Sequence, residues 1–164
     1  MKAVVPGSFD PVTSGHVDVI ERASRIYREV VVAVAVNQSK AALFSVEERI
    51  EMLREATSHL PNVRVDSFDG LLVKYVKEQE AKVIVKGLRA VSDFEYEFQM
   101  ALMNRKQAPQ VETVFVMTGA EHIYLSSSIV KEIAALGGCI RGMVPEAVEK
   151  RLMTKVRSKD REAG

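Results

Sequence analysis

Short apolar runs alternate with longer stretches of helical periodicity along most of the chain. Residues 30–36 are continuously apolar, which is typical of a strand buried on both faces. The expected strands are residues 3–5, 30–36, 63–68, 82–85 and 113–117, and the expected helices are residues 15–28, 45–58, 71–79, 92–105 and 127–136. Strands that alternate with helices form parallel sheets with right-handed crossovers. We therefore predict an α/β fold, a Rossmann-like open parallel sheet with helices on both faces.

The length and composition suit one domain. The chain has 164 residues, of which 47% are apolar, enough to fill a single core. We expect one domain over residues 1–164, with a C-terminal helix at about residues 145–156 and then a polar tail that frays. Two serines, Ser45 and Ser92, each precede a glutamate by three residues, at Glu48 and Glu95. This is the spacing of a capping box, so we expect helices to begin at both serines.

The charge balance excludes some partners. There are 23 basic and 22 acidic residues, a net charge of +1, which creates no general attraction to nucleic acid or membranes. The single cysteine, Cys139, excludes an internal disulfide and a cysteine-pair metal site. The N-terminal apolar run is interrupted at Pro6 and Asp10, well short of a signal peptide or a membrane span. We expect a cytoplasmic protein that binds neither nucleic acid nor membrane.

The segment of residues 6–16 joins the first expected strand to the first expected helix. Open parallel sheets bind ligands at the carboxyl ends of their strands, and a helix start offers free amide donors to a phosphate. His16 would face the same space, although a lone histidine is more often an ordinary half-buried side chain. Neither of the two commonest phosphate loops, Walker A and G-x-G-x-x-G, occurs in the chain. The segment therefore predicts an anion site of another type.

Two motifs resemble the signatures of the nucleotidyltransferase superfamily. Thr13-Ser14-Gly15-His16 is similar to its T/H-x-G-H signature. Residues 126–131, Ser-Ser-Ser-Ile-Val-Lys, are similar to its second signature, a serine-rich turn that opens a helix and carries a basic residue three positions later. Serine hydroxyls and helix-start amides can bind the outer phosphates of ATP, although the same serines also suit helix capping.

Further stretches extend the resemblance over nearly the whole chain, to the bacterial phosphopantetheine adenylyltransferase family. They are Lys40 and residues 6–16, 44–49, 86–89 and 93–105. The resemblance implies an enzyme of coenzyme A biosynthesis that transfers AMP from ATP to 4′-phosphopantetheine, giving dephospho-coenzyme A and pyrophosphate. The chain departs from the family at Ser8, where many members have threonine, and at Lys86, where many have arginine. Both changes keep the essential group, a hydroxyl or a positive charge.

The same resemblance implies the roles of individual residues. The catalytic residues would be His16, which stabilises the transition state, Lys40 and Ser128. The phosphopantetheine site would consist of Ser8, Lys40, Leu72 and Lys86. The ATP site would consist of Ser8, Phe9, His16, Gly87, Leu88, Arg89, Glu97, His122, Ile123, Tyr124, Leu125, Ser126, Ser127 and Ser128. The resemblance also implies Mg²⁺ held by the ATP phosphates rather than by a protein cage, a homohexamer, and feedback inhibition by coenzyme A.

Without the resemblance, some of these residues suit ordinary roles. Lys40 lies in a polar loop, where a lysine is usually just solvated. Glu97 lies on an expected helix and is typical of an exposed acid. The side chains expected to face the core from that helix are Phe94, Phe98, Ala101 and Leu102.

Parts of the sequence also match other functions. Ser128 and Lys131 match the S-x-x-K spacing of serine acylases, but we reject this interpretation because the companion Ser-Asp-Asn and Lys-Thr-Gly motifs are absent. An ionised acceptor phosphate can attack the α-phosphorus of ATP directly, so we expect no covalent enzyme intermediate. The alternatives are a nucleotidyltransferase with another acceptor, such as a nicotinamide mononucleotide adenylyltransferase or a cytidylyltransferase, and a noncatalytic adenine-nucleotide sensor on the same scaffold.

Overall fold

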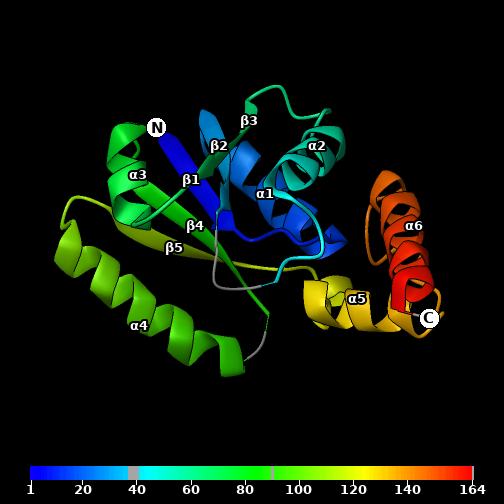
Figure 1. Ribbon diagram of the computed structural model, residues 1–164. Helices are drawn as coiled ribbons and strands as arrows, with labels where there is room; N and C mark the ends of the chain where they lie inside the picture. Colours follow the sequence, from blue (N-terminus) through cyan, green and yellow to red (C-terminus); the bar gives the residue numbers. More distant parts are fainter. Residues whose placement is uncertain (37–40, 90, 164) are drawn as a thin grey trace.

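The computed structural model describes residues 1–36, 41–89 and 91–163, with only the backbone of residues 91–93 and 159–163. Its strands are β1 (Lys2–Gly7), β2 (Glu29–Ala35), β3 (Val63–Phe68), β4 (Val83–Leu88) and β5 (Glu112–Met117). They form one sheet in the order β3-β2-β1-β4-β5, and every neighbouring pair is parallel (Figure 1). This confirms the predicted open parallel sheet.

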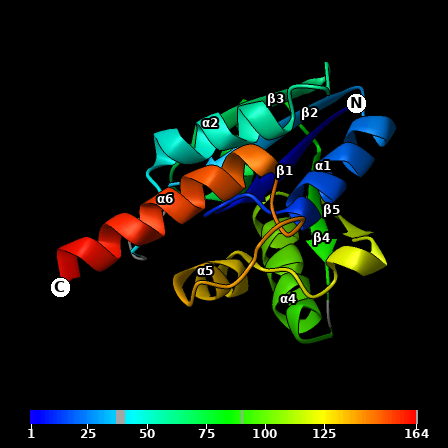
Figure 2. The same ribbon diagram turned by 90° about the vertical axis from the view of Figure 1, so that its right-hand side faces the viewer.

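Helices cover both faces of this sheet. They are α1 (Ser14–Ile26), α2 (Val46–Ala56), α3 (Leu72–Glu78), α4 (Val91–Gln107), α5 (Ser127–Ala135) and α6 (Glu146–Ala163), with a short 3-10 helix, η1 (Ala120–His122). Successive side chains of a strand point to opposite faces. Ala3 and Val5 of β1 accordingly pack in one core with α1, α2, α5 and α6, whereas Val4 packs in a second core with α3 and the residues that follow α4. Figure 2 shows α2 and α6 running side by side over the first face.

Some element boundaries differ from those expected. The capping box at the start of α2 is confirmed: Ser45 Oγ accepts from the Glu48 amide at 3.2 Å, and Glu48 Oε2 accepts from the Ser45 amide at 2.8 Å. Helix α4 instead begins at Val91, so Ser92 lies inside the helix rather than at its cap. Strand β4 continues to Leu88 rather than ending at residue 85, because its ladder with β5 extends past the charged side chain that suggested an end.

The C-terminal helix is longer than expected. Helix α6 extends to Ala163, so the expected end of the helix at residue 156 was wrong. Residues 157–162 are polar and carry no apolar periodicity, but most of them are good helix formers. The helix propensity of these residues therefore extends α6 beyond the part whose apolar side chains are buried.

The apolar stripe of α4 does not face the core. Phe94, Phe98 and Leu102 are 45%, 47% and 48% exposed, and Phe94 stacks on Phe98 at 5.6 Å between ring centroids. Figure 1 shows α4 at the side of the sheet next to β5, and the helix contacts mainly β5 and α3. The periodicity correctly identified an apolar face, but the described part of the chain leaves it uncovered.

Candidate active site

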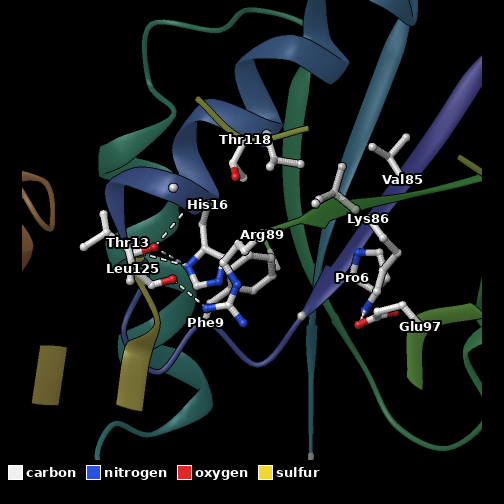
Figure 3. Close-up of a pocket in the computed structure, with 15 residues that line it drawn as sticks. Pro6, Phe9, Thr13, His16, Val85, Lys86, Arg89, Glu97, Thr118 and Leu125 are labelled. Carbon is white, nitrogen blue, oxygen red and sulfur yellow. Dashed lines mark hydrogen bonds and ion pairs between the residues drawn. The ribbon is translucent and has the colours of Figure 1, made fainter. Parts of the chain in front are cut away.

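A pocket opens at the carboxyl ends of β1 and β4 (Figure 3). The chain leaves β1 towards β2 on one side, and β4 lies on the other, so the pocket occupies the point where the strand order reverses. Such switch points are the usual ligand sites of open parallel sheets. Of the residues proposed from the sequence, the pocket brings together Phe9, His16, Lys86, Gly87, Arg89, Glu97 and Leu125.

His16 is held by a capping box at the start of α1. The Thr13 amide donates to His16 Nδ1 at 2.9 Å, and Thr13 Oγ1 accepts from the His16 amide at 3.3 Å. Because Nδ1 accepts a hydrogen bond, the neutral ring carries its proton on Nε2. The fold therefore presents a neutral N–H donor to the pocket. Sequence reasoning missed this device, since the usual capping box has glutamate or glutamine in the position of His16.

The surroundings keep this ring uncharged. Burial lowers the pKa of His16 to about 4, and the positive charges of Arg89 and Lys86 contribute in the same direction. The ring nevertheless remains partly exposed where it lines the pocket. At neutral pH the imidazole can therefore donate a hydrogen bond to an anion without carrying a full charge.

Phe9 supports the ring from the side. Its side chain meets His16 edge to face, with 5.1 Å between ring centroids and an interplanar angle of 72°. The backbone of Phe9 has φ of 50°, in the left-handed region that costs a non-glycine residue energy. This conformation lays the ring over Gly7, where an added Cβ would lie 3.0 Å from two ring atoms. A side chain at residue 7 would therefore require the Phe9 ring to shift by a few tenths of an ångström from its place beside His16.

Lys86 and Arg89 contribute positive side chains to the wall of the pocket. Lys86 Nζ lies 3.2 Å from Glu97 Oε1, and Figure 3 shows this pair across the pocket from His16. Arg89 Nη1 donates to the Leu125 carbonyl oxygen at 2.5 Å, which connects the end of β4 to the segment before α5. The site thus offers a neutral donor and two cations to anionic groups.

A second hollow lies beside this pocket along α4, and the pocket is called the first hollow below. Lys86 and Glu97 line both hollows. The second is otherwise lined by Leu72, Ile84, Tyr96, Met100, Ala101, Asn104 and Thr113. Leu72 therefore lies with the second hollow and not with the first. The pair of hollows suits a ligand with a charged group at their junction and a longer, less polar arm beside α4.

The remaining proposed residues that the structure describes lie outside both hollows. Lys40 falls outside the described residues. Ser8 is exposed, and its carbonyl oxygen accepts from Arg49 Nη1 at 2.8 Å. Leu88 ends β4, His122 ends η1, and Ile123 and Tyr124 are 45% and 61% exposed. These residues lie on the chain segments that border the first hollow.

The three serines at the start of α5 have different surroundings. Ser126 Oγ accepts from the Ile129 amide at 3.1 Å and caps the helix. Ser127 Oγ donates to the Pro11 carbonyl oxygen at 2.8 Å. Ser128 is exposed, and its side chain makes no hydrogen bond with the residues that the structure describes.

Lys131 does not serve Ser128 as a base. Its Nζ lies 2.9 Å from Asp10 Oδ2. A serine nucleophile needs a neighbouring base within hydrogen-bond reach. The structure thus supports rejecting the serine-acylase interpretation.

Across the described residues, no group of three or more His, Cys, Asp or Glu side chains lies close enough together to hold a metal ion. Among the described residues that line the first hollow, Glu97 contributes a carboxylate, and it is paired with Lys86. In the same part of the chain, no helix is long and apolar enough to cross a membrane.

The depressed pKa of His16 predicts how stability responds to acid. The unfolded ring gains a proton below about pH 6.5, whereas the folded ring does so only near pH 4. The unfolded state therefore binds more protons in this window, and the free energy of unfolding should fall as the pH drops through it. NMR titration of the His16 ring protons checks this: a midpoint near 6.5 would contradict it.

A cytidylyltransferase-like family profile matches residues 4–133. Among curated relatives, the phosphopantetheine adenylyltransferase of Dictyoglomus turgidum is 57% identical over 159 residues, which cover 97% of this chain and 99% of the relative. The phosphopantetheine adenylyltransferase of Caldanaerobacter subterraneus subsp. tengcongensis is 58% identical, covering 93% of this chain and 96% of the relative.

Solved structures agree on the fold. The crystal structure of a protein from Vibrio parahaemolyticus, assigned as a nicotinate-nucleotide adenylyltransferase, superposes with a TM-score of 0.67 at 17% identity, over 94% of this chain and 93% of that one. At such low identity the likeness shows the Rossmann-like architecture, and nothing about the acceptor.

Proposed function

The chain belongs to the phosphopantetheine adenylyltransferases. We propose that its pocket is the site where the adenylyl group of ATP is transferred to 4′-phosphopantetheine, giving dephospho-coenzyme A and pyrophosphate. The observation that carries this proposal is the pair of hollows joined at Lys86 and Glu97. Two hollows that share these residues support a site for two substrates, and we place the acceptor phosphate at the junction, the pantetheine arm beside Leu72 and α4, and ATP beside His16.

The chemical step is a direct displacement. An oxygen of the acceptor phosphate forms a bond to the α-phosphorus of ATP, and the bond from that phosphorus to the bridging oxygen breaks as pyrophosphate leaves with the electron pair. The acceptor is already ionised, so the protein supplies no nucleophile. Its contribution is to align two anions and offset their repulsion.

Lys86, Arg89 and His16 then each have a defined part. Lys86 leaves Glu97 to bind the acceptor phosphate, and Arg89 lies on the side of the ATP phosphates. His16 donates from Nε2 to the α-phosphate as negative charge grows there. A donor of this kind stabilises the transition state more than the bound substrates, and its removal typically lowers the rate by about 10²–10³-fold.

We propose that Mg²⁺ enters with ATP. The described site offers one paired carboxylate, which fits an ion coordinated mainly by phosphate oxygens. The ion would offset charge on those phosphates, and Lys86, Arg89 and His16 would position the reacting groups around them.

The exposed stripe of α4 supports assembly. Phe94, Phe98 and Leu102 form an apolar face on which another copy of the chain can pack. We propose a homohexamer, as the family resemblance implies, together with feedback inhibition by coenzyme A, whose pantetheine arm matches that of the acceptor. A cytoplasmic location fits these substrates.

Ser128 separates direct transfer from covalent catalysis. A neutral hydroxyl that donates to a charged phosphate contributes about 1.5–3 kcal/mol, so Ser128→Ala should keep measurable activity. Ser128→Thr keeps the hydroxyl, so it should be more active than Ser128→Ala if the additional methyl group fits. Peptide mapping after rapid quench should find no adenylylated protein, and a covalent Ser128 intermediate would overturn direct transfer.

One assay tests the acceptor. The protein is incubated with ATP, Mg²⁺ and, in separate reactions, 4′-phosphopantetheine or nicotinamide mononucleotide, with CTP as an alternative donor, and the products are identified by mass. Dephospho-coenzyme A with pyrophosphate is the expected result. Tight ATP binding without pyrophosphate release for any acceptor would favour a nucleotide sensor.

A further inference from the structure

The carboxylate of Asp10 joins three separate parts of the chain. Its Oδ1 accepts from the Phe44 amide at 2.9 Å, and its Oδ2 accepts from the Leu43 amide at 3.0 Å and from Lys131 Nζ at 2.9 Å. The Asp10 side chain is 10% exposed, and it is not among the residues that line the first hollow. Asp10 therefore connects the first loop both to the segment before α2 and to α5.

These partners keep the buried carboxylate ionised. Burial alone would raise the pKa of Asp10, but the hydrogen bond from Lys131 and those from the Leu43 and Phe44 amides hold that pKa below its usual value. A buried charge is tolerated only when it is paired and hydrogen-bonded. The site therefore determines the position of all three partners rather than allowing several arrangements.

The residues on either side of Asp10 contact His16 and the start of α5. Phe9, which precedes Asp10, packs against His16. Pro11, which follows Asp10, accepts a hydrogen bond from Ser127, so α5 is attached to the first loop at two consecutive residues. On the other side, Leu43 and Phe44 lead into the capping box of α2 at Ser45.

We propose that Asp10 is a positioning residue for adenylyl transfer, which holds the segment before α2 and the start of α5 at a fixed place on the first loop. This rests on the proposed function, in which the start of α5 binds ATP phosphates and the first loop presents His16 to the reacting phosphorus. In-line displacement depends on the relative position of two substrates, and a displacement of about 1 Å can cost about 10² in rate. Neither substrate needs to touch Asp10 for this effect.

The test uses Asp10→Asn and Lys131→Met in the full chain. Lys150→Met is the matched control, because Lys150 makes an exposed ion pair with Glu146 on α6, at 3.0 Å. For each variant, kcat is measured well below its melting temperature, and the Kd values of ATP and of phosphopantetheine are measured separately. We expect kcat to fall by about 10- to 100-fold in both test variants, while each Kd changes less than about threefold. Lys150→Met should match the parent.

Two further variants sharpen the outcome. Lys131→Arg keeps a cation for Asp10 and should restore kcat to within a few-fold of the parent. The double variant Asp10→Asn/Lys131→Met should lose no more than the worse single variant, because both substitutions remove one interaction. If Asp10→Asn does not fold, Lys131→Met and Lys131→Arg still decide the matter.

Each contrary outcome has a separate meaning. A lowered melting temperature with parental kcat would overturn the proposal and leave Asp10 a stabilising residue only. An ATP Kd that rises in Lys131→Met as much as kcat falls would also overturn it, and would make Lys131 a phosphate ligand. A parental protein that makes no dephospho-coenzyme A would instead contradict the proposed function, and the positioning role with it.

Discussion

We expect His16→Ala to lower kcat by about two to three orders of magnitude while the Kd of ATP changes only a few-fold. The reason is the geometry of the ring. Nδ1 is occupied by the Thr13 amide at 2.9 Å, so Nε2 is the nitrogen that can donate to the α-phosphate. This donor stabilises charge that is largest in the transition state, so its loss should appear in kcat rather than in ATP binding. Steady-state kinetics and equilibrium binding of ATP measure the two effects.

A second variant separates catalysis from helix capping. Alanine also removes the hydrogen bond from the Thr13 amide to the His16 ring in the capping box of α1, which lowers stability by about 1 kcal/mol. Glutamine is a usual residue at that position of a capping box, so His16→Gln should restore the cap without the imidazole. We expect its melting temperature to be near that of the parent and its kcat to be as low as that of His16→Ala. His59→Ala, at an exposed histidine paired with Glu21, is the control. Turnover of His16→Gln within a few-fold of the parent would refute the role of the ring.

The sheet was predictable because its signal is local. Residues 30–36 are apolar without interruption, and the structure places Val30, Val32 and Val34 in one core and Val31 in the other. A strand with helices on both faces needs such a sequence. The position of the first hollow followed from topology, since the loop after β1 must open at the carboxyl edge of the sheet.

The interactions between distant segments were not predictable. Asp10 and Lys131 are separated by 121 residues, and neither residue type nor spacing indicates that they form a pair. The pairing of Lys86 with Glu97 was equally hidden, because Lys86 appeared to follow a strand that in fact continues through it. The apolar stripe of α4 was visible in the sequence. Periodicity predicts that such a helix face packs against something, but it does not identify the packing partner.

The pairing of Lys86 with Glu97 also predicts a large effect on the acceptor. Lys86→Ala should lower kcat/KM for phosphopantetheine by about 100-fold, with a change of only a few-fold in the Kd of ATP. Loss of a charged hydrogen bond accounts for about 1.5–3 kcal/mol, or roughly 10- to 150-fold. The Glu97 carboxylate, 3.2 Å from Lys86 Nζ in the structure, would then face the acceptor phosphate without its counterion. Like charges repel, so the result should lie near the upper end of that range.

The carboxylate can be tested on its own. The double variant Lys86→Ala/Glu97→Gln removes the repulsion while the cation stays absent. Its kcat/KM for phosphopantetheine should therefore be about tenfold higher than that of Lys86→Ala. Lys86→Arg, which introduces the residue common in the family, should stay within a few-fold of the parent because it keeps the charge and adds bidentate geometry. Binding of ATP and of phosphopantetheine, measured separately for each variant, completes the test. A large loss of ATP affinity with unchanged phosphopantetheine affinity would reverse the assignment and place Lys86 on the side of the leaving pyrophosphate.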